Sequence, residues 1–193
     1  MYTPQQFSIP TLVGLSDISV AEHIKLYTGY VNNYNTIINE LDNHRKSETI
    51  DTLMARELHR RIGFEFNGIR NHEYYFQQLE HGPSPINPDS SLYKKIVTDF
   101  GSFDSWQSDF ISTAMTRGIG WAILSYDKQS NTLMNHFVDE QHIGHLNSTQ
   151  FIFGIDMWEH AFVFDYQPSG KKQYVGDFFE NLNWEVIEGN FKK

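Results

Sequence analysis

The sequence predicts an α+β protein, in which an N-terminal helical hairpin precedes an α/β domain with a three-stranded antiparallel sheet. The first part of the chain repeats apolar residues every three to four positions, which is typical of amphipathic helices. The second part contains short segments rich in β-branched and aromatic residues, which favour strands. The Pro-rich stretch "GPSPINPDSS" separates the two, so we expect a hairpin domain at 1–82, a linker at 83–90 and a second domain at 91–193.

The composition indicates a packed globular protein and excludes several kinds of partner and site. Of 193 residues, 39% are apolar and 15% aromatic, which is enough to form a core. The net charge of −9 and the absence of a long basic run argue against binding nucleic acid. There is no cysteine, so any metal must be held by nitrogen and oxygen ligands. No signal-peptide pattern or membrane-length apolar run is present, so we expect a cytoplasmic protein without a membrane partner.

The first helix is predicted over residues 19–42. Ser19 and Glu22 have the spacing of a capping box. An apolar stripe with a period near 3.6 follows, made of Leu26, Tyr27, Tyr30, Val31, Tyr34, Ile37, Ile38 and Leu41. Extending the stripe backwards by one turn places His23 on the face that points to the core.

A second helical region is predicted from about Glu48 to Glu80. Gly63 and Gly68 predict a break or bend near "IGFEFNG", because glycine weakens a helix interior. The last segment places His72 on an apolar stripe, and "HGP" ends the helix.

The second domain is predicted to begin with two shorter helices, near residues 90–99 and 102–116. "GWAILSYD" and "TLMNHFVD" then read as strands joined by "KQSN", and "FIFGI" as a third strand that ends at Asp156. One amphipathic helix, "KKQYVGDFFENLNWEVI", closes the chain.

Three histidines and one aspartate occupy predicted core segments. A single histidine on an apolar face is usually a hydrogen-bonded core residue, but His23, His72 and His160 come from three separate elements. A carboxylate such as Asp156 is costly to bury unless a cation or hydrogen bonds offset its charge. Together these side chains form a nitrogen and oxygen set suited to iron, manganese or zinc. The alternative is an aromatic core turn at "WEH" whose charges pair with one another or with a partner chain.

The segment "DMWEHAFVFDY" resembles the D-x-W-E-H-A signature of the iron/manganese superoxide dismutase family. "HIKLYTGYVNNYN" resembles the first ligand helix of a divergent branch of that family, "FEFNGIRNHEYYF" its second ligand helix, "RGIGWAIL" the strand with its active-site tryptophan, and "NLNWEVIE" its closing helix. The resemblance implies a metal held by His23, His72, Asp156 and His160.

The same resemblance implies that the protein converts superoxide to dioxygen and hydrogen peroxide, with one iron or manganese ion per subunit. Trp121 and Trp158 would enclose the metal cavity, and Tyr30 would be the gateway. Tyr30 follows His23 by seven residues where the commoner branches have eight, so Tyr34 is the alternative gateway.

Family members also carry a side chain that hydrogen-bonds the metal-bound solvent. The helix position that supplies it in some branches is Gly68 here, so the resemblance moves this role to the loop "DEQHIGHL". Gln141 is the first candidate, His142 the second and His145 the third. Gly154 is the residue type found in many manganese-using members, which favours manganese or use of either metal.

The resemblance further implies a homodimer in which Glu159 pairs with the partner subunit's His160. Two family residues differ in this chain: Val163 replaces an interface tyrosine, and Lys171 replaces an arginine of the substrate funnel. Lys171 keeps the positive charge but not the fork of donors.

Two other functions remain open from the sequence. A non-haem iron oxygenase or a metal hydrolase would use two histidines and a carboxylate with open coordination positions. A degenerate family member would act as a dimeric binding or structural module, an interpretation that the irregular first helix keeps open.

Overall fold

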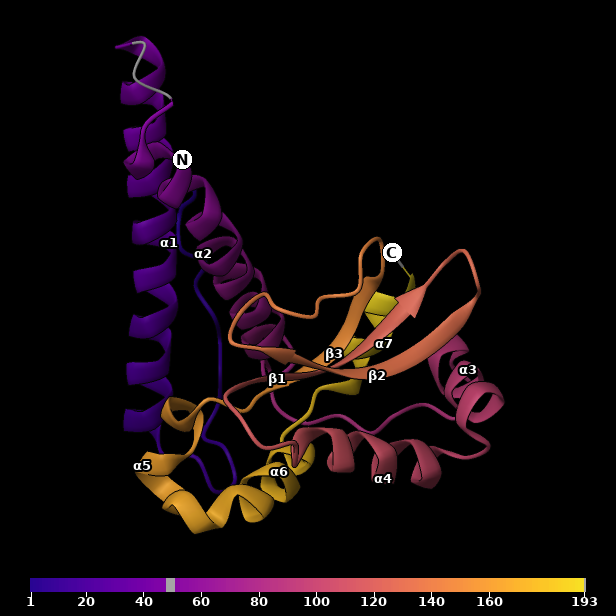
Figure 1. Cartoon of the computed structure of the whole chain (residues 1–193). Helices are drawn as coiled ribbons and strands as arrows, with labels where there is room; N and C mark the ends of the chain where they lie inside the picture. Colours follow the sequence, from indigo (N-terminus) through magenta and orange to yellow (C-terminus); the bar gives the residue numbers. More distant parts are fainter. Residues whose placement is uncertain (48–50, 193) are drawn as a thin grey trace.

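The computed structural model describes residues 1–47 and 51–192 and confirms the predicted α+β fold class. Figure 1 shows α1 and α2 side by side as a long hairpin that projects beyond the sheet. The elements in chain order are α1 (Asp17–Lys46), α2 (Leu53–Gln77), α3 (Ser91–Phe100), α4 (Phe103–Ala114), β1 (Gly120–Asp127), β2 (Thr132–Asp139), β3 (Gln150–Asp156), η1 (Glu159–Ala161), α5 (Val163–Tyr166), η2 (Pro168–Gly170), α6 (Lys171–Glu180) and α7 (Trp184–Lys192).

Helix α1 begins earlier than predicted. Its N-cap is Ser16, whose side chain accepts a hydrogen bond from the backbone N–H of Ser19 at 3.2 Å. Ser19 therefore lies inside the helix, and the predicted capping box is wrong, because Ser16 already satisfies the free N–H group. The predicted stripe is buried at Tyr27, Val31, Ile37 and Leu41, and His23 lies on it. Leu26, predicted on the same stripe, is 44% exposed, because it precedes Tyr27 by one residue and is rotated away from the core face.

Helix α2 runs without interruption from Leu53 to Gln77, so the predicted break near "IGFEFNG" is wrong. Gly68 serves a close approach between helices instead: a Cβ atom there would lie 2.5 Å from the ring of Tyr30 on α1. Because Gly68 has no side chain, the Tyr30 ring of α1 can pack directly against the backbone of α2. This packing outweighs the weak helix propensity of glycine.

The ends of α2 also differ from the prediction. Its predicted start at Glu48 lies outside the described residues, and the helix begins after Thr52, whose side chain accepts from the N–H of Ala55. It ends at Gln77 and not at Glu80. His81 and Gly82 follow with φ angles of 65° and 88°, which turn the chain out of the helix as the "HGP" segment predicts.

The three predicted strands form one antiparallel sheet in the order β2-β1-β3. In the register between β1 and β3, Trp121 lies opposite Asp156. Directly opposed residues point to the same face of a sheet, so the indole and the carboxylate face the same side. Gln78, just after α2, hydrogen-bonds the backbone of Gly154 and ties the hairpin to β3.

The predicted closing helix is two helices, α6 and α7, and the expectation of one continuous helix is wrong. The side chain of Asn181 donates to the carbonyl of Val13, and that of Asn183 donates to the carbonyl of Glu80. Asparagine side chains that bind backbone elsewhere favour helix ends over helix interiors. The break therefore anchors the C-terminal helices to the N-terminal segment and to the end of the hairpin.

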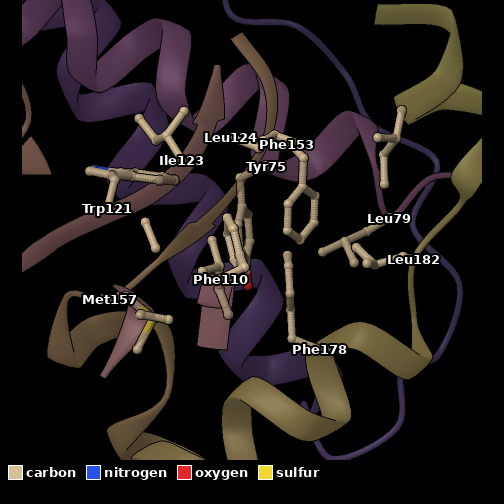
Figure 2. Packing of buried hydrophobic residues seen from close by; sticks show 14 of the residues in the cluster. Tyr75, Leu79, Phe110, Trp121, Ile123, Leu124, Phe153, Met157, Phe178 and Leu182 are labelled. Atoms are coloured by element: carbon tan, nitrogen blue, oxygen red, sulfur yellow. The ribbon is translucent and has the colours of Figure 1, made fainter. Parts of the chain in front are cut away.

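A shared aromatic core joins the hairpin to the rest of the chain, as Figure 2 shows. Tyr75 of α2 stacks on Phe178 of α6, with ring centroids 5.2 Å apart, and Phe153 of β3 lies 6.2 Å from Phe178. All three side chains are buried. Among the described residues no helix is long and apolar enough to cross a membrane.

We expect Gly68→Ala to lower the free energy of unfolding of the metal-free protein by about 1–3 kcal/mol, the usual cost of overpacking, because the new methyl group meets the Tyr30 ring. Gly29→Ala on α1 is the matched control, since apart from the neighbouring backbone of its own helix no atom lies within 4 Å of its Cβ position. It should leave stability unchanged or raise it by up to about 1 kcal/mol. Urea denaturation of both variants measures the difference, and equal stabilities would contradict the packing role of Gly68.

Candidate metal centre

Four side chains from four different elements meet at one point between the hairpin and the sheet. His23 comes from α1, His72 from α2, Asp156 from the end of β3 and His160 from η1. One donor atom from each lies within 4.8 Å of all the others. These are the four residues that the sequence predicts as ligands, and the structure brings all of them together.

The three imidazoles converge on a single oxygen atom. The Nε2 atoms of His23 and His160 each lie 3.1 Å from Oδ2 of Asp156, and Nε2 of His72 lies 3.5 Å from it. Asp156 and His72 are fully buried, while His160 keeps 22% of its side chain exposed. The centre is therefore closed on most sides and most open beside His160.

His72 is held in the tautomer that a metal ligand requires. Its Nδ1–H donates to the carbonyl of Gly68 at 2.6 Å, which leaves the lone pair on Nε2. Nε2 is buried and has no hydrogen-bond partner among the described residues. A buried, unpartnered nitrogen lone pair that faces a carboxylate and two imidazoles fits a bound cation.

Burial sets the charges of the centre. Desolvation lowers the pKa of His72 to about 3 and is also the largest cause of the lowered pKa of His23. Burial by itself raises the pKa of Asp156, but its interactions with His160 and His23 outweigh this effect and hold the pKa well below its usual range. At neutral pH the site thus presents the uncharged imidazoles of His23 and His72 beside one carboxylate, and with His160 these groups form a donor set that suits iron or manganese.

Hydrogen bonds hold the carboxylate in place. The second carboxylate oxygen of Asp156, Oδ1, accepts a hydrogen bond from the backbone N–H of Trp158 at 2.8 Å. The backbone carbonyl of Asp156 accepts one from the hydroxyl of Tyr174 at 2.9 Å. The indole of Trp158 donates to the carbonyl of Glu140 and stacks on the ring of His160. This second set of contacts orients both C-terminal donors.

A buried chain of hydrogen bonds runs beside the four donors. The indole N–H of Trp121 donates to Oε1 of Gln141 at 2.9 Å, and Nε2 of Gln141 donates to the hydroxyl of Tyr30 at 2.9 Å. Gln141 is fully buried, and Asn71 donates to its carbonyl at 3.1 Å. The rings of Trp121 and Tyr30 each lie 5.1 Å from His72, so this chain borders the centre.

The alternative candidates lie elsewhere. Tyr34 packs against Tyr2 and Phe66, with ring centroids 5.1 and 5.9 Å apart. His142 packs its ring edge against Phe64 at 5.7 Å, and His145 is half-buried in the same loop. Of the loop side chains considered, Gln141 is the one that the structure links to both Trp121 and Tyr30.

Sequence reasoning missed a polar network behind the ligands. The hydroxyl of Tyr27 accepts from the N–H of Gln5 and donates to Glu73, which also binds Arg70 at 2.6 Å. Burial is the largest cause that raises the pKa of Tyr27, to about 12. The available signals were that Tyr27 lies one turn after His23 and that Glu73 follows His72. The network links the two ligand helices to the N-terminal segment.

Glu159 and Lys171 lie at the surface beside the centre. The carboxylate of Glu159 is exposed, and Lys171 donates to the carbonyl of Thr116 at 2.9 Å. Both line one hollow together with Ile119 and Phe162. Val163 is half-buried at the start of α5.

Three imidazoles and one carboxylate around a single point, between a helical hairpin and an α+β domain, define a protein with a mononuclear nitrogen- and oxygen-ligated metal centre. Comparison with known protein families matches two models of the same family to this chain. The model of the iron/manganese superoxide dismutases, alpha-hairpin domain, matches residues 16–80, and that of their C-terminal domain matches residues 88–190. The chain therefore belongs to the iron/manganese superoxide dismutase family.

Individual relatives agree with this assignment. The chain is 32% identical over 171 residues to the protein named superoxide dismutase [Mn] 1 of Halobacterium salinarum, which covers 89% of this chain and 83% of the relative. It is 32% identical over 187 residues to superoxide dismutase [Fe] of Aquifex pyrophilus, covering 94% and 86%. The relatives thus include proteins named for each of the two metals.

Proposed function

We propose that the protein is an antioxidant enzyme, a superoxide dismutase that converts two superoxide ions and two protons to dioxygen and hydrogen peroxide. One iron or manganese ion would be held by His23, His72, Asp156 and His160. The observation that carries the proposal is the convergence of these four donors, with the lone pair of His72 buried and without a partner. Membership in the family and relatives named for both metals support it.

When bound, an iron or manganese ion would supply the one-electron redox chemistry that the conversion of superoxide needs. Burial lowers the pKa of His72 to about 3, so this donor is deprotonated at neutral pH and its lone pair is free to bind the ion. Asp156, fully buried, contributes one negative charge that offsets part of the charge of the cation. Zinc does not fit this reaction because it has no redox chemistry.

Protons for the peroxide would pass along Tyr30 and Gln141. Burial is the largest of the causes that raise the pKa of Tyr30 well above its usual range, so the phenol keeps its proton at neutral pH. The Tyr30 side chain is half-buried, and Gln141 lies between its hydroxyl and Trp121. These contacts support the proposal that Tyr30 is the gateway and proton relay, that Gln141 tunes the bound solvent, and that Trp121 and Trp158 are walls of the cavity.

Metal preference is a finer proposal. Gly154 leaves no room for a side chain, because a Cβ atom there would lie 2.4 Å from the ring of Phe151. A glycine at this position favours manganese or the use of either metal, as the sequence comparison with the family suggests. The relatives named for manganese and for iron are consistent with either outcome.

The other two interpretations are not favoured. A non-haem oxygenase or hydrolase site needs two histidines and a carboxylate with open positions, whereas a third histidine converges here. A degenerate module would have no need for the four donors, and all of them are kept.

We further propose a cytoplasmic homodimer, made of subunits divided into the domains 1–82 and 91–193 with a linker at 83–90. Family models that match residues 16–80 and 88–190 support the division. Glu159 is exposed one residue from His160, and the large apolar side chains Ile119 and Phe164 are 41% and 64% exposed. This surface suits an isologous contact in which Glu159 pairs with the partner subunit's His160.

The central test is metal content together with superoxide consumption. We expect purified protein to contain about one iron or manganese ion per subunit and to consume superoxide. His23→Ala should lose most of the metal and the activity, because it removes one of the four donors. His59→Ala is the control, since this histidine is exposed on α2 far from the four donors. Full metal content and activity in His23→Ala would disprove the ligand assignment.

Gln141→Ala should leave metal bound but lower superoxide consumption by at least about tenfold, the scale on which metal sites respond to the loss of an outer-shell partner. The paired variant His142→Ala should keep most of the activity, because its ring lies against Phe64 and not in the hydrogen-bond chain. Elemental analysis and stopped-flow kinetics measure both effects. The opposite pattern would assign the role to His142.

Glu159→Ala should weaken the dimer and the retention of metal together, since the carboxylate would bind the partner's His160. Glu185→Ala removes the same charge from another exposed site and should change neither property. Sedimentation equilibrium and elemental analysis give the two readouts. A fully active wild-type monomer at micromolar concentration would rule out the proposed pairing.

A further inference from the structure

The substrate in the proposed function is a small anion, but the chain carries a net charge of −9. An acidic protein attracts an anion to its centre only where local positive charge outweighs the overall field. Lys171 is the cation that the family comparison points to. Its ammonium group donates to Thr116 and shares a hollow with the carboxylate of Glu159, which opposes its field.

Three half-buried rings form a cluster at the Tyr30 end of the hydrogen-bond chain. We call them the entrance ring: Tyr30, Phe64 and His142. Phe64 packs against both of the others, with ring centroids 5.9 Å from Tyr30 and 5.7 Å from His142. Tyr30 in turn lies 5.1 Å from His72. These contacts lead step by step from the partly exposed surface of α2 to a buried donor.

Arg61 is fixed over the entrance ring. Its guanidinium carbon lies 3.7 Å from the centre of the Phe64 ring, a cation–π contact. Its Nε–H donates to Oε1 of Glu65 at 2.8 Å, which holds the group in this position. The side chain is 45% exposed, so its remaining N–H donors are accessible.

The ion pair of Arg61 and Glu65 has its positive end at the surface and its negative end buried. Glu65 is only 3% exposed, so its negative charge lies beneath the positive charge of Arg61. An anion that approaches from solvent therefore meets the positive end of the pair first. The arginines earlier on α2 differ: Arg56 and Arg60 pair with Asp51 and Glu57, which are themselves 83% and 53% exposed.

The charge of Arg61 also acts inward as far as the gateway. It lowers the pKa of Tyr30, against the larger raising effects of burial, of Asp156 and of Glu65.

We propose that Arg61, held over Phe64 and backed by buried Glu65, is the cation that guides small anions to the entrance ring. The substrate it would guide, superoxide, rests on the proposed function. Arg61 contacts none of the four donors and acts by steering, so its effect appears in the rate of encounter and in the dependence of that rate on salt.

The first test compares Arg61→Gln with Arg60→Gln, which makes the same charge change one residue away. At about 10 mM ionic strength, where the Debye length is about 30 Å, we expect Arg61→Gln to lower kcat/KM about two- to fivefold. The loss should shrink towards zero at about 0.5 M salt, Arg61→Lys should restore most of the rate, and Arg60→Gln should have little effect. Equal effects of the two Gln variants, or a loss independent of salt, would overturn the proposal.

The second test is a substitution that we expect to raise kcat/KM. Glu65→Gln removes the buried counter-charge and leaves Arg61 uncompensated, so kcat/KM at low salt should rise and its dependence on salt should steepen. Thermal unfolding and metal content confirm that the variant is folded and loaded. A folded, loaded Glu65→Gln variant with an unchanged or lower rate at low salt would contradict the orientation argument.

The third test is independent of activity and uses the metal-free protein with sodium azide as the probe. In a titration followed by NMR, azide should shift the side-chain amide of Gln141 and the ring of His142 in the wild type and in Arg60→Gln. In Arg61→Gln the apparent affinity should fall at least about threefold. If the wild-type protein bound azide in this way but consumed no superoxide, the proposed function would fail while the anion site stood. Unchanged azide affinity in Arg61→Gln would overturn the anion site itself.

Discussion

The burial of the Asp156 carboxylate is the constraint on which the rest of the structure depends. An ionised carboxylate without exposure to water is tolerated only when charge and hydrogen bonds compensate it. Here three imidazoles, one hydrogen bond from the backbone N–H of Trp158 and a proposed cation provide that compensation. Because the imidazoles come from α1, α2 and η1, the need to compensate one side chain ties the hairpin to the sheet.

The close contact of α1 and α2 at Gly68 decides where the remaining chemistry has to come from. The Tyr30 ring occupies the space that a side chain at position 68 would need, and the carbonyl of Gly68 is engaged by His72. No hydrogen-bond donor can reach the centre from that point of the helix. The loop after β2 supplies Gln141 instead, and Gln141 in turn binds the phenol that Gly68 admits. Gly68 and Gln141 thus act together: the glycine makes room for the Tyr30 ring, and the glutamine supplies the hydrogen bond that the helix cannot.

Two kinds of feature could be predicted from the sequence: segments with a regular hydrophobic period, and single side chains whose burial is energetically unfavourable without a partner. The stripes of the two long helices placed His23 and His72 on core faces, and a carboxylate at the end of an apolar strand singled out Asp156. The features that were missed depend on long-range contacts. From the sequence alone Gly68 predicts a helix break, and only its contact with Tyr30 explains why the helix continues. Asn181 lies in a segment predicted to be helical, and only the hydrogen bond of its side chain to Val13 explains why the helix ends there.

Charge in this molecule is layered from the centre outwards. Burial keeps the His23 and His72 imidazoles neutral, the Tyr30 phenol above them is kept protonated, and a guanidinium lies outermost over Phe64. Glu65, buried beneath Arg61, fits this order: it fixes the cation and raises the pKa of Tyr30. A redox centre that must hold a cation inside and attract an anion from outside needs opposite fields a short distance apart. An oriented ion pair provides them without adding net charge, so an acidic protein can attract an anion while its overall charge stays negative.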